Sequence, residues 1–222
     1  MSHTSNQAVF VRQDDPTPPT PAHRRGWRSQ FARPSGPLGW LVGHLMALKN
    51  EERSLWVLSL LDLRPTDRVL ETGYGSGADV RRVAAIARQG LVAGVDHSET
   101  MWRQARRRNA EAVKAGRVDL RLGPASRLPF PDASFDKAFS INAAQFWRAP
   151  SEELRELRRV LERGGLLAVA VQPRSKGATE ETAVSTGRAL VEALKAAGLQ
   201  DVRLETRKLR PVSVVCALGR NA

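Results

Sequence analysis

Residues 69–77, which read Val-Leu-Glu-Thr-Gly-Tyr-Gly-Ser-Gly, decide how the rest of the chain is interpreted. The apolar pair that opens this stretch is typical of a buried strand. The glycines at every second position of its later part predict a sharply turning backbone with no Cβ between it and a ligand. A helical pattern begins near Asp79, and a helix N-terminus after a glycine-rich turn suits a polar, nucleotide-like ligand. The stretch therefore predicts a cofactor pocket at the end of a strand.

Strands and helices alternate after this turn. Apolar and alternating runs predict strands at 68–72, 91–96, 118–122, 135–141 and 166–172. The alternation at 118–122 is typical of a strand at the edge of a sheet. Helical spacing of apolar residues predicts helices at 79–89, 98–115, 151–162 and 179–197. Two last strands, 201–209 and 212–219, are separated only by Arg210-Pro211, so they must form an antiparallel hairpin. The fold class predicted is α/β: a Rossmann-like, seven-stranded, mostly parallel sheet with helices on both faces and a C-terminal antiparallel β-hairpin.

The N-terminal part has a different composition. Residues 1–34 are rich in proline and arginine and predict a disordered or extended tail, because such a segment cannot form a packed core. Two helices are expected next, at 37–48 and at about 51–62. Residues 35–222 are thus expected to form one domain, which is the natural count for a chain of this length.

Composition narrows the class of protein. Cys216 is the single cysteine, so neither an intrachain disulfide nor a cysteine-based zinc site is expected, and a reducing cytoplasm is the simplest location. No apolar run approaches the roughly 18–20 residues that a membrane span needs, and the polar N-terminus does not resemble a secretory signal. The net charge of +12 would favour nucleic acid, but the basic residues are spread along the chain. The densest cluster, Arg103 and Arg106 to Arg108, is interpreted as the solvated face of a helix.

The glycine-rich turn alone does not identify the cofactor. Gly73, Gly75 and Ala78 also fit the dinucleotide fingerprint, and Asp96 ends the second strand where a carboxylate can accept hydrogen bonds from a ribose diol. Glu71 argues against NAD, because a carboxylate at that strand end would repel a pyrophosphate. It suits a ligand with a positively charged end. The chain also contains a single mononucleotide-like half before its terminal hairpin, whereas a dinucleotide fold has two.

Further pieces in this order carry a resemblance to a known family. They are Gly94-Val95-Asp96, Gly123–Phe130, Phe135–Asn142 and Arg158–Gly165, together with Val69–Gly77. With these pieces, residues 36–220 resemble the class I S-adenosylmethionine-dependent methyltransferases, in particular the small-molecule, methyltransferase-11-like branch. The resemblance implies S-adenosylmethionine as cofactor, transfer of a methyl group to a small-molecule acceptor by in-line displacement, and no obligatory catalytic residue.

The resemblance also implies roles for single residues. Glu71 would bind the methionyl end of the cofactor, and Asp96 would bind both ribose hydroxyls. The remaining cofactor-binding positions that it implies are the backbone of Gly73, Gly75 and Gly77, His97 beside the adenine, Ala125 and Ser126 at an adenine ring nitrogen, and Ser140 on the methyl-transfer side. Pro124 departs from the family, which usually has an acidic residue there to receive the adenine amino group.

Catalytic residues are not defined by this pattern. The candidates for contact with the acceptor are Asn142, Tyr74 and Trp147, followed by His44, Gln145 and Gln172. Two other functions stay open at this point. One is a degenerate methyltransferase-fold protein that binds RNA through a basic surface. Pro124 and the positive net charge favour this alternative. The other is an NAD-linked reductase, which Glu71 disfavours. Neither the acceptor nor the oligomeric state can be predicted.

Overall fold

The structure, a computed structural model, describes residues 50–222. The tail predicted at 1–34, the helix predicted at 37–48 and His44 lie outside these residues. Residues 50–60 are helical, in agreement with the helix expected at about 51–62. The chain divides into two units near residue 57, and the description below concerns residues 57–222.

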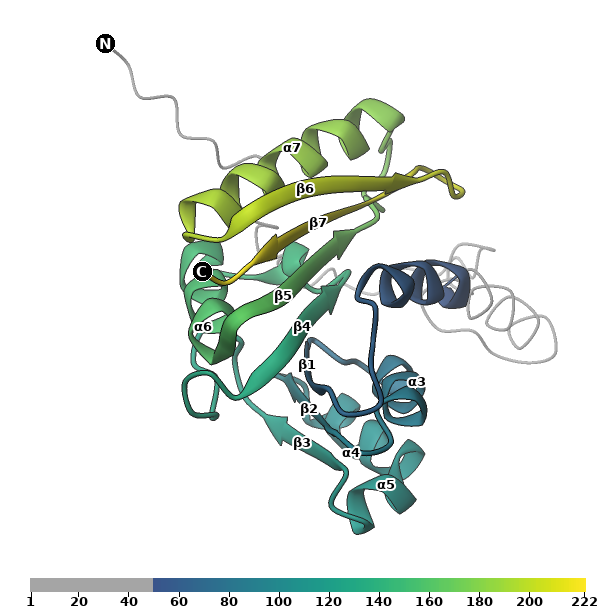
Figure 1. Cartoon of the computed structure of the whole chain (residues 1–222). Coiled ribbons are helices and arrows are strands. Elements are labelled where there is room, and N and C mark those ends of the chain that lie inside the picture. Colours follow the sequence, from purple (N-terminus) through teal and green to yellow (C-terminus); the bar gives the residue numbers. More distant parts are fainter. Residues whose placement is uncertain (1–49) are drawn as a thin grey trace, which may run out of the picture. The chain divides into compact units, whose positions relative to one another are not determined.

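A seven-stranded sheet forms the centre of this unit (Figure 1). Its strands are β1 (Arg68–Thr72), β2 (Leu91–Asp96), β3 (Val118–Leu122), β4 (Phe135–Ile141), β5 (Leu161–Val171), β6 (Gln200–Arg207) and β7 (Val214–Arg220). They lie in the order β3-β2-β1-β4-β5-β7-β6. The first five pair in parallel, whereas β7 is antiparallel to both β5 and β6. The predicted sheet, its terminal hairpin and the edge position of β3 are therefore confirmed.

Helices cover both faces of the sheet. They are α3 (Ala78–Ile86), α4 (Glu99–Arg108), α5 (Ala110–Lys114), α6 (Pro150–Val160) and α7 (Glu180–Ala196), and a short 3₁₀ helix η1 spans Ala144–Phe146. The strand order reverses direction between β1 and β4, and right-handed crossovers then place α3 to α5 on one face and α6 and α7 on the other. Figure 1 shows these two groups on opposite sides. Ligands of such sheets bind at the carboxyl ends of the strands beside this reversal.

The central strands are buried on both faces. All positions of β1 after its first residue are buried, as are the last seven positions of β5. One continuous apolar core extends over the face covered by α6 and α7 and includes the fully buried side chains of Phe135, Leu157 and Leu190. Burial on both faces is typical of parallel sheets covered by helices on each side.

The helix predicted at 98–115 is interrupted in the structure. It divides into α4 and α5 at Asn109, which is buried. The Asn109 side-chain amide donates to the backbone carbonyls of Ala105 (2.9 Å) and Gly77 (3.0 Å). The second bond ties the helix to the glycine-rich turn. A Cβ at Gly77 would lie 2.8 Å from this amide, so the close approach requires glycine there.

β5 begins earlier than predicted. The sequence indicates a strand from residue 166, after a break at Gly164-Gly165, but the strand starts at Leu161 directly after α6. The register between β4 and β5 shifts in this part, which marks a bulge. The Gly164 amide donates to the carbonyl of Asn221, and the Asn221 amide donates to that of Gly165. The glycine pair is thus part of an irregular strand.

Candidate functional site

The glycine-rich turn after β1 has a left-handed backbone. Gly73, Gly75 and Gly77 have φ angles of 72°, 52° and 73°. Two backbone hydrogen bonds hold the turn: the Gly73 amide donates to the Val95 carbonyl (2.8 Å), and the Gly77 amide donates to the Tyr74 carbonyl (2.9 Å). The first bond fixes the turn against β2, and the second closes the turn on itself.

The three glycines face different surroundings. A Cβ at Gly73 would lie 2.2 Å from the Cβ of Ala143, and one at Gly77 would lie 2.7 Å from the Cβ of Ala105. A Cβ at Gly75 would have nothing within 4 Å. Two of the glycines therefore allow close packing, and the middle one lines an open space at the end of the sheet.

Asp96 ends β2 beside this open space. Its side chain is 7% exposed, and its Oδ2 accepts a hydrogen bond from the Gly75 amide (2.9 Å). Its Oδ1 accepts one from the amide of Ser98 (2.8 Å), which caps α4. Each oxygen of an ionised carboxylate can accept a further bond. Asp96 is therefore fixed in orientation and still able to accept two ligand hydroxyls.

Glu71 lies near the end of the neighbouring strand β1 and is 3% exposed. Its Oε2 is buried and has no hydrogen-bond partner within residues 50–222. Burial raises the pKa of Glu71 well above its ordinary value, and the charges of Asp79 and Asp96 raise it further, while the Val80 amide opposes the shift. A cationic ligand group would supply the missing partner and favour the ionised form.

Two hydroxyl groups near Glu71 are also unpaired. Thr72 Oγ1 at the end of β1 and Ser140 Oγ in β4 are fully buried and have no partner within residues 50–222. β4 is the strand that pairs with β1 on the side away from β2. Buried polar groups are normally hydrogen-bonded. The unpaired atoms near the carboxyl ends of β1 and β4 therefore indicate a binding site for a polar ligand.

The loop after β3 approaches Asp96. The Gly123 amide donates to the Asp96 carbonyl (2.9 Å), and Ala125 and Ser126 follow within the same loop, both half-buried. The side chain of His97 is 82% exposed, and its Nδ1 lies 3.9 Å from Asp96 Oδ1. The loop that carries the predicted adenine-binding residues is thus anchored to the residue predicted to bind the ribose.

The candidates for acceptor contact differ in their surroundings. Asn142 follows β4 with a φ of 56°, and its Oδ1 accepts a hydrogen bond from the Gln172 amide (2.8 Å). Gln145 lies beside it and donates through Nε2 to the Asn142 carbonyl (3.2 Å). The Gln172 side chain donates to the carbonyls of Arg210 and Val212, and this ties it to the loop before β7.

The two aromatic candidates are buried. Tyr74 is 4% exposed, and its hydroxyl donates to the Arg121 carbonyl (3.1 Å). Its ring lies against β2 so closely that a Cβ at Gly94 would be 2.6 Å from Tyr74 Cδ1. Burial also raises the pKa of Tyr74, which keeps the phenol neutral. Trp147 belongs to the apolar core under α6. Both rings are therefore packed inside the protein and are not exposed to solvent.

The sequence analysis did not single out two residues at this edge. Phe146, in η1 after β4, is 67% exposed, which is unusual for a large aromatic side chain. Arg108 donates to Ser76 Oγ in the glycine-rich turn (2.7 Å). The position of Arg108 within a run of arginines did not indicate this contact. Phe146 could have been noticed, because it is an aromatic residue four positions after Asn142.

The comparisons with known proteins agree with this geometry. The methyltransferase domain family matches residues 70–169. The chain is also 30% identical over 180 residues to the uncharacterized methyltransferase YdaC of Bacillus subtilis, and the match covers 81% of this chain and 97% of that protein. The chain belongs to the class I S-adenosylmethionine-dependent methyltransferases.

This methyltransferase also resembles a further sequence relative and, in fold alone, a solved structure. It is 36% identical over 113 residues to the 27-O-demethylrifamycin SV methyltransferase of Amycolatopsis mediterranei, a match that covers 50% of this chain but only 40% of that protein. A SAM-dependent methyltransferase from Aquifex aeolicus has the same fold, with a TM-score of 0.60 and 20% identity over 76% of this chain and 89% of the other.

The family membership settles the two alternatives left open by the sequence. The chain is an enzyme of the methyltransferase class with S-adenosylmethionine as cofactor, so the NAD-linked reductase and the degenerate binding protein are set aside. The buried, unpaired oxygen of Glu71 and the open space at Gly75 are consistent with this cofactor. Among residues 50–222, no helix is both long and apolar enough to cross a bilayer.

Proposed function

We propose that this methyltransferase acts on a small-molecule acceptor and that Glu71, Asp96 and the Gly75 backbone hold its cofactor. The observation that carries the proposal is the pair of buried carboxylates at the ends of adjacent strands, of which Asp96 accepts from the Gly75 amide beside an open space. Bound S-adenosylmethionine supplies a methyl group on a positively charged sulfur. Membership in the family is compatible with either a small-molecule or a macromolecular methyl acceptor.

Glu71 suits the cationic end of the cofactor. A buried carboxyl with an unpaired oxygen is costly, and an ammonium group would both fill the vacant hydrogen-bond position and offset the charge. Asp96 suits the ribose, because the amides of Gly75 and Ser98 hold its two oxygens in place before the ligand arrives. Such pre-ordering reduces the entropy lost on binding.

The small size of the acceptor is inferred from two facts. The relative from Amycolatopsis mediterranei is named for a small-molecule acceptor, 27-O-demethylrifamycin SV. In this chain the exposed ring of Phe146 lies on the same edge of the sheet as Asn142 and offers an apolar contact surface. Alignment of the acceptor and exclusion of water would then be the main contributions of the protein to the rate. A cytoplasmic location stays a prediction from the single cysteine.

Calorimetry with S-adenosylhomocysteine tests the cofactor site. D96N is expected to weaken binding about 10- to 100-fold, because charge-assisted hydrogen bonds contribute about 1.5–3 kcal/mol each. E71Q is expected to weaken binding as well. D201N and E111Q change exposed carboxylates and serve as controls. Wild-type protein that binds neither S-adenosylmethionine nor its demethylated product, or a D96N variant with unchanged affinity, would overturn the assignment.

A labelling experiment tests the acceptor class. The enzyme is incubated with methyl-labelled S-adenosylmethionine and a whole-cell extract, which is then separated into small molecules, nucleic acid and protein. We expect label in the small-molecule fraction with wild-type enzyme, and less label with E71Q at a limiting concentration of the cofactor. Label found in nucleic acid or protein instead would contradict a small-molecule acceptor without affecting the cofactor site.

A further inference from the structure

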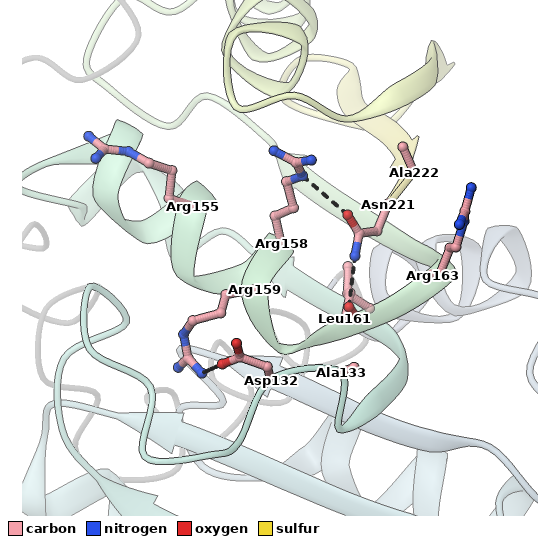
Figure 2. A pocket seen from close by; sticks show the side chains of 9 residues that line it. All are labelled: Asp132, Ala133, Arg155, Arg158, Arg159, Leu161, Arg163, Asn221 and Ala222. Carbon is pink, nitrogen blue, oxygen red and sulfur yellow. Dashed lines mark hydrogen bonds and ion pairs between the residues drawn. The ribbon is translucent and has the colours of Figure 1, made fainter.

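Four arginines line a groove at the amino ends of the parallel strands, at the opposite end of the sheet from the cofactor site. This arginine groove has a volume of about 420 Å³, and its lining includes Arg155, Arg158, Arg159 and Arg163 (Figure 2). Leu161, which also lines it, is the first residue of β5, whereas Glu71 and Asp96 lie at the carboxyl ends of the parallel strands β1 and β2. The groove is therefore separate from the methyl-transfer edge.

One of these arginines is neutralised by the fold. Arg159 forms ion pairs with Asp132 (2.6 Å) and Glu156 (2.7 Å), and it donates to the carbonyls of Leu128 and Phe130. The Glu156 carboxylate also accepts from the Leu128 amide, and the pKa of Glu156 is lowered by its bond to Arg159. Arg159 thus fastens the loop before β4 to α6 and has little charge left for a ligand.

Arg158 is fixed but keeps its charge. Its Nε donates to Asn221 Oδ1 (3.1 Å) and its Nη1 to the Ala197 carbonyl (3.3 Å), both of which are neutral acceptors. It also lies directly against Gly198, where a Cβ would come within 2.5 Å of Nη1. The guanidinium is therefore held in one place without a carboxylate partner among residues 50–222.

Arg155 and Arg163 are exposed and flank Arg158. Arg155 donates through Nε to the Ser151 carbonyl within its own helix (3.1 Å). Neither side chain has an ion-pair partner in the described part of the chain. Figure 2 shows the guanidinium groups of Arg155, Arg158 and Arg163 well apart from one another instead of converging on one point. The groove thus presents three separated positive charges.

We propose that the arginine groove binds the phosphate backbone of a nucleic acid. Separated cations match the repeated charges of a polyanion better than a single phosphate, which a convergent cluster would hold. No aromatic side chain is among the described residues that line the groove, so bases have no ring to stack on. Binding should therefore be independent of sequence and strongly dependent on salt. The net charge of +12 adds a long-range attraction.

The position of the groove defines what this binding can do. A nucleic acid held at the amino ends of β4 and β5 leaves the carboxyl ends, where methyl transfer takes place, open to a small acceptor. The groove would thus attach the enzyme to a nucleic acid without making that nucleic acid the acceptor. The inference goes beyond the proposed function and does not depend on it.

Fluorescence anisotropy with a short, labelled, single-stranded RNA of mixed sequence tests the groove. R155E/R163E is expected to bind about tenfold more weakly at low salt and to lower the slope of log K against log salt by about 1.4, because each phosphate contact on a single strand contributes about 0.7. The control is R88E/R107E, which reverses two exposed arginines on the opposite face of the sheet. Arg88 also donates through Nε to a carbonyl of its own segment, as Arg155 does.

The control variant separates a site from a general charge effect. Unchanged RNA binding by R155E/R163E would overturn the proposal. Equal losses in R155E/R163E and R88E/R107E would also overturn it, because they would show that the net charge alone attracts RNA. S-adenosylhomocysteine binding should be unchanged in R155E/R163E, so failure here leaves the cofactor site untouched.

Discussion

Glu71 places an ionisable carboxyl where burial outweighs the groups that favour its charge, the Val80 amide and Arg82. The residue is 3% exposed, its Oε2 is unpaired within residues 50–222, and Asp79 and Asp96 add negative charge nearby. The apo protein must therefore either protonate this carboxyl or bear the cost of a buried charge. A buried carboxyl with an unpaired oxygen is expected where a bound ligand supplies the missing partner.

E71Q should stabilise the apo protein at neutral and alkaline pH. The pKa of Glu71 is raised in the folded state, so the wild type is most stable below the ordinary value of 4.5 and loses stability as the pH rises through the folded-state pKa. Glutamine does not ionise and avoids this loss, which we expect to be about 1 kcal/mol. Urea denaturation at several pH values should show the gain disappear in acid. E111Q, a change at an exposed glutamate, should show no such pH dependence. If E71Q were less stable than the wild type at high pH, the favourable effects of the Val80 amide and Arg82 on the carboxylate would outweigh the cost of its burial.

The resemblance to the family implies an acidic residue where this chain has Pro124, and an aspartate there should improve cofactor binding. Its side chain is exposed in the loop after β3. If the adenine lies beside it, P124D supplies an acceptor for the adenine amino group and gains roughly 0.5–1.5 kcal/mol, up to about tenfold in affinity. Calorimetry with S-adenosylhomocysteine measures the gain. P131D is the matched control in the same loop, and equal affinities for both variants would place the adenine elsewhere.

At the scale of elements, the glycine-rich turn packs against Ala143, the residue that precedes η1. Alanine at Gly75 must adopt a positive φ and should cost about 1–2 kcal/mol. Alanine at Gly73 has the same strain, and its Cβ would also overlap the Cβ of Ala143 at 2.2 Å, which should add about 1–3 kcal/mol. Urea denaturation should therefore rank G73A as clearly less stable than G75A. The double variant G73A/A143G should recover most of the difference, and a failure to recover any would mean that the turn and Ala143 are not in contact.

Elements defined by local pattern were predicted from the sequence, and those shaped by distant partners were not. The strands β1 to β4 and the final hairpin follow from apolar runs and short links. The break at Asn109 could not be predicted, because the carbonyl of Gly77 that its amide bonds lies 32 residues away. The early start of β5 depends likewise on Asn221 at the other end of the domain.

In the domain as a whole, the carboxyl ends and the amino ends of the parallel strands differ in their chemistry. Carboxylates and unpaired hydroxyls gather at the carboxyl ends of the strands, and arginines line the groove at the amino ends of β4 and β5. The sequence indicated Glu71, Asp96 and Gly75, because a parallel sheet brings consecutive strand ends together. It did not show that Tyr74 and Trp147 are buried, because a position next to a strand end does not tell whether a side chain points to the ligand or into the core.

Ligand binding at one edge should stabilise the whole domain. Free S-adenosylhomocysteine at 100 times its Kd adds about 2.7 kcal/mol to the free energy of unfolding. A chain of this size gains about 2–4 °C in Tm for each kcal/mol, so the Tm should rise by roughly 5–10 °C. D96N and E71Q should show a much smaller rise at the same ligand concentration. R155E/R163E should show the full rise, because its changes lie at the opposite edge of the sheet. A reduced rise in R155E/R163E would mean that the two edges are coupled through the sheet, and the groove could then no longer be treated as independent of the cofactor site.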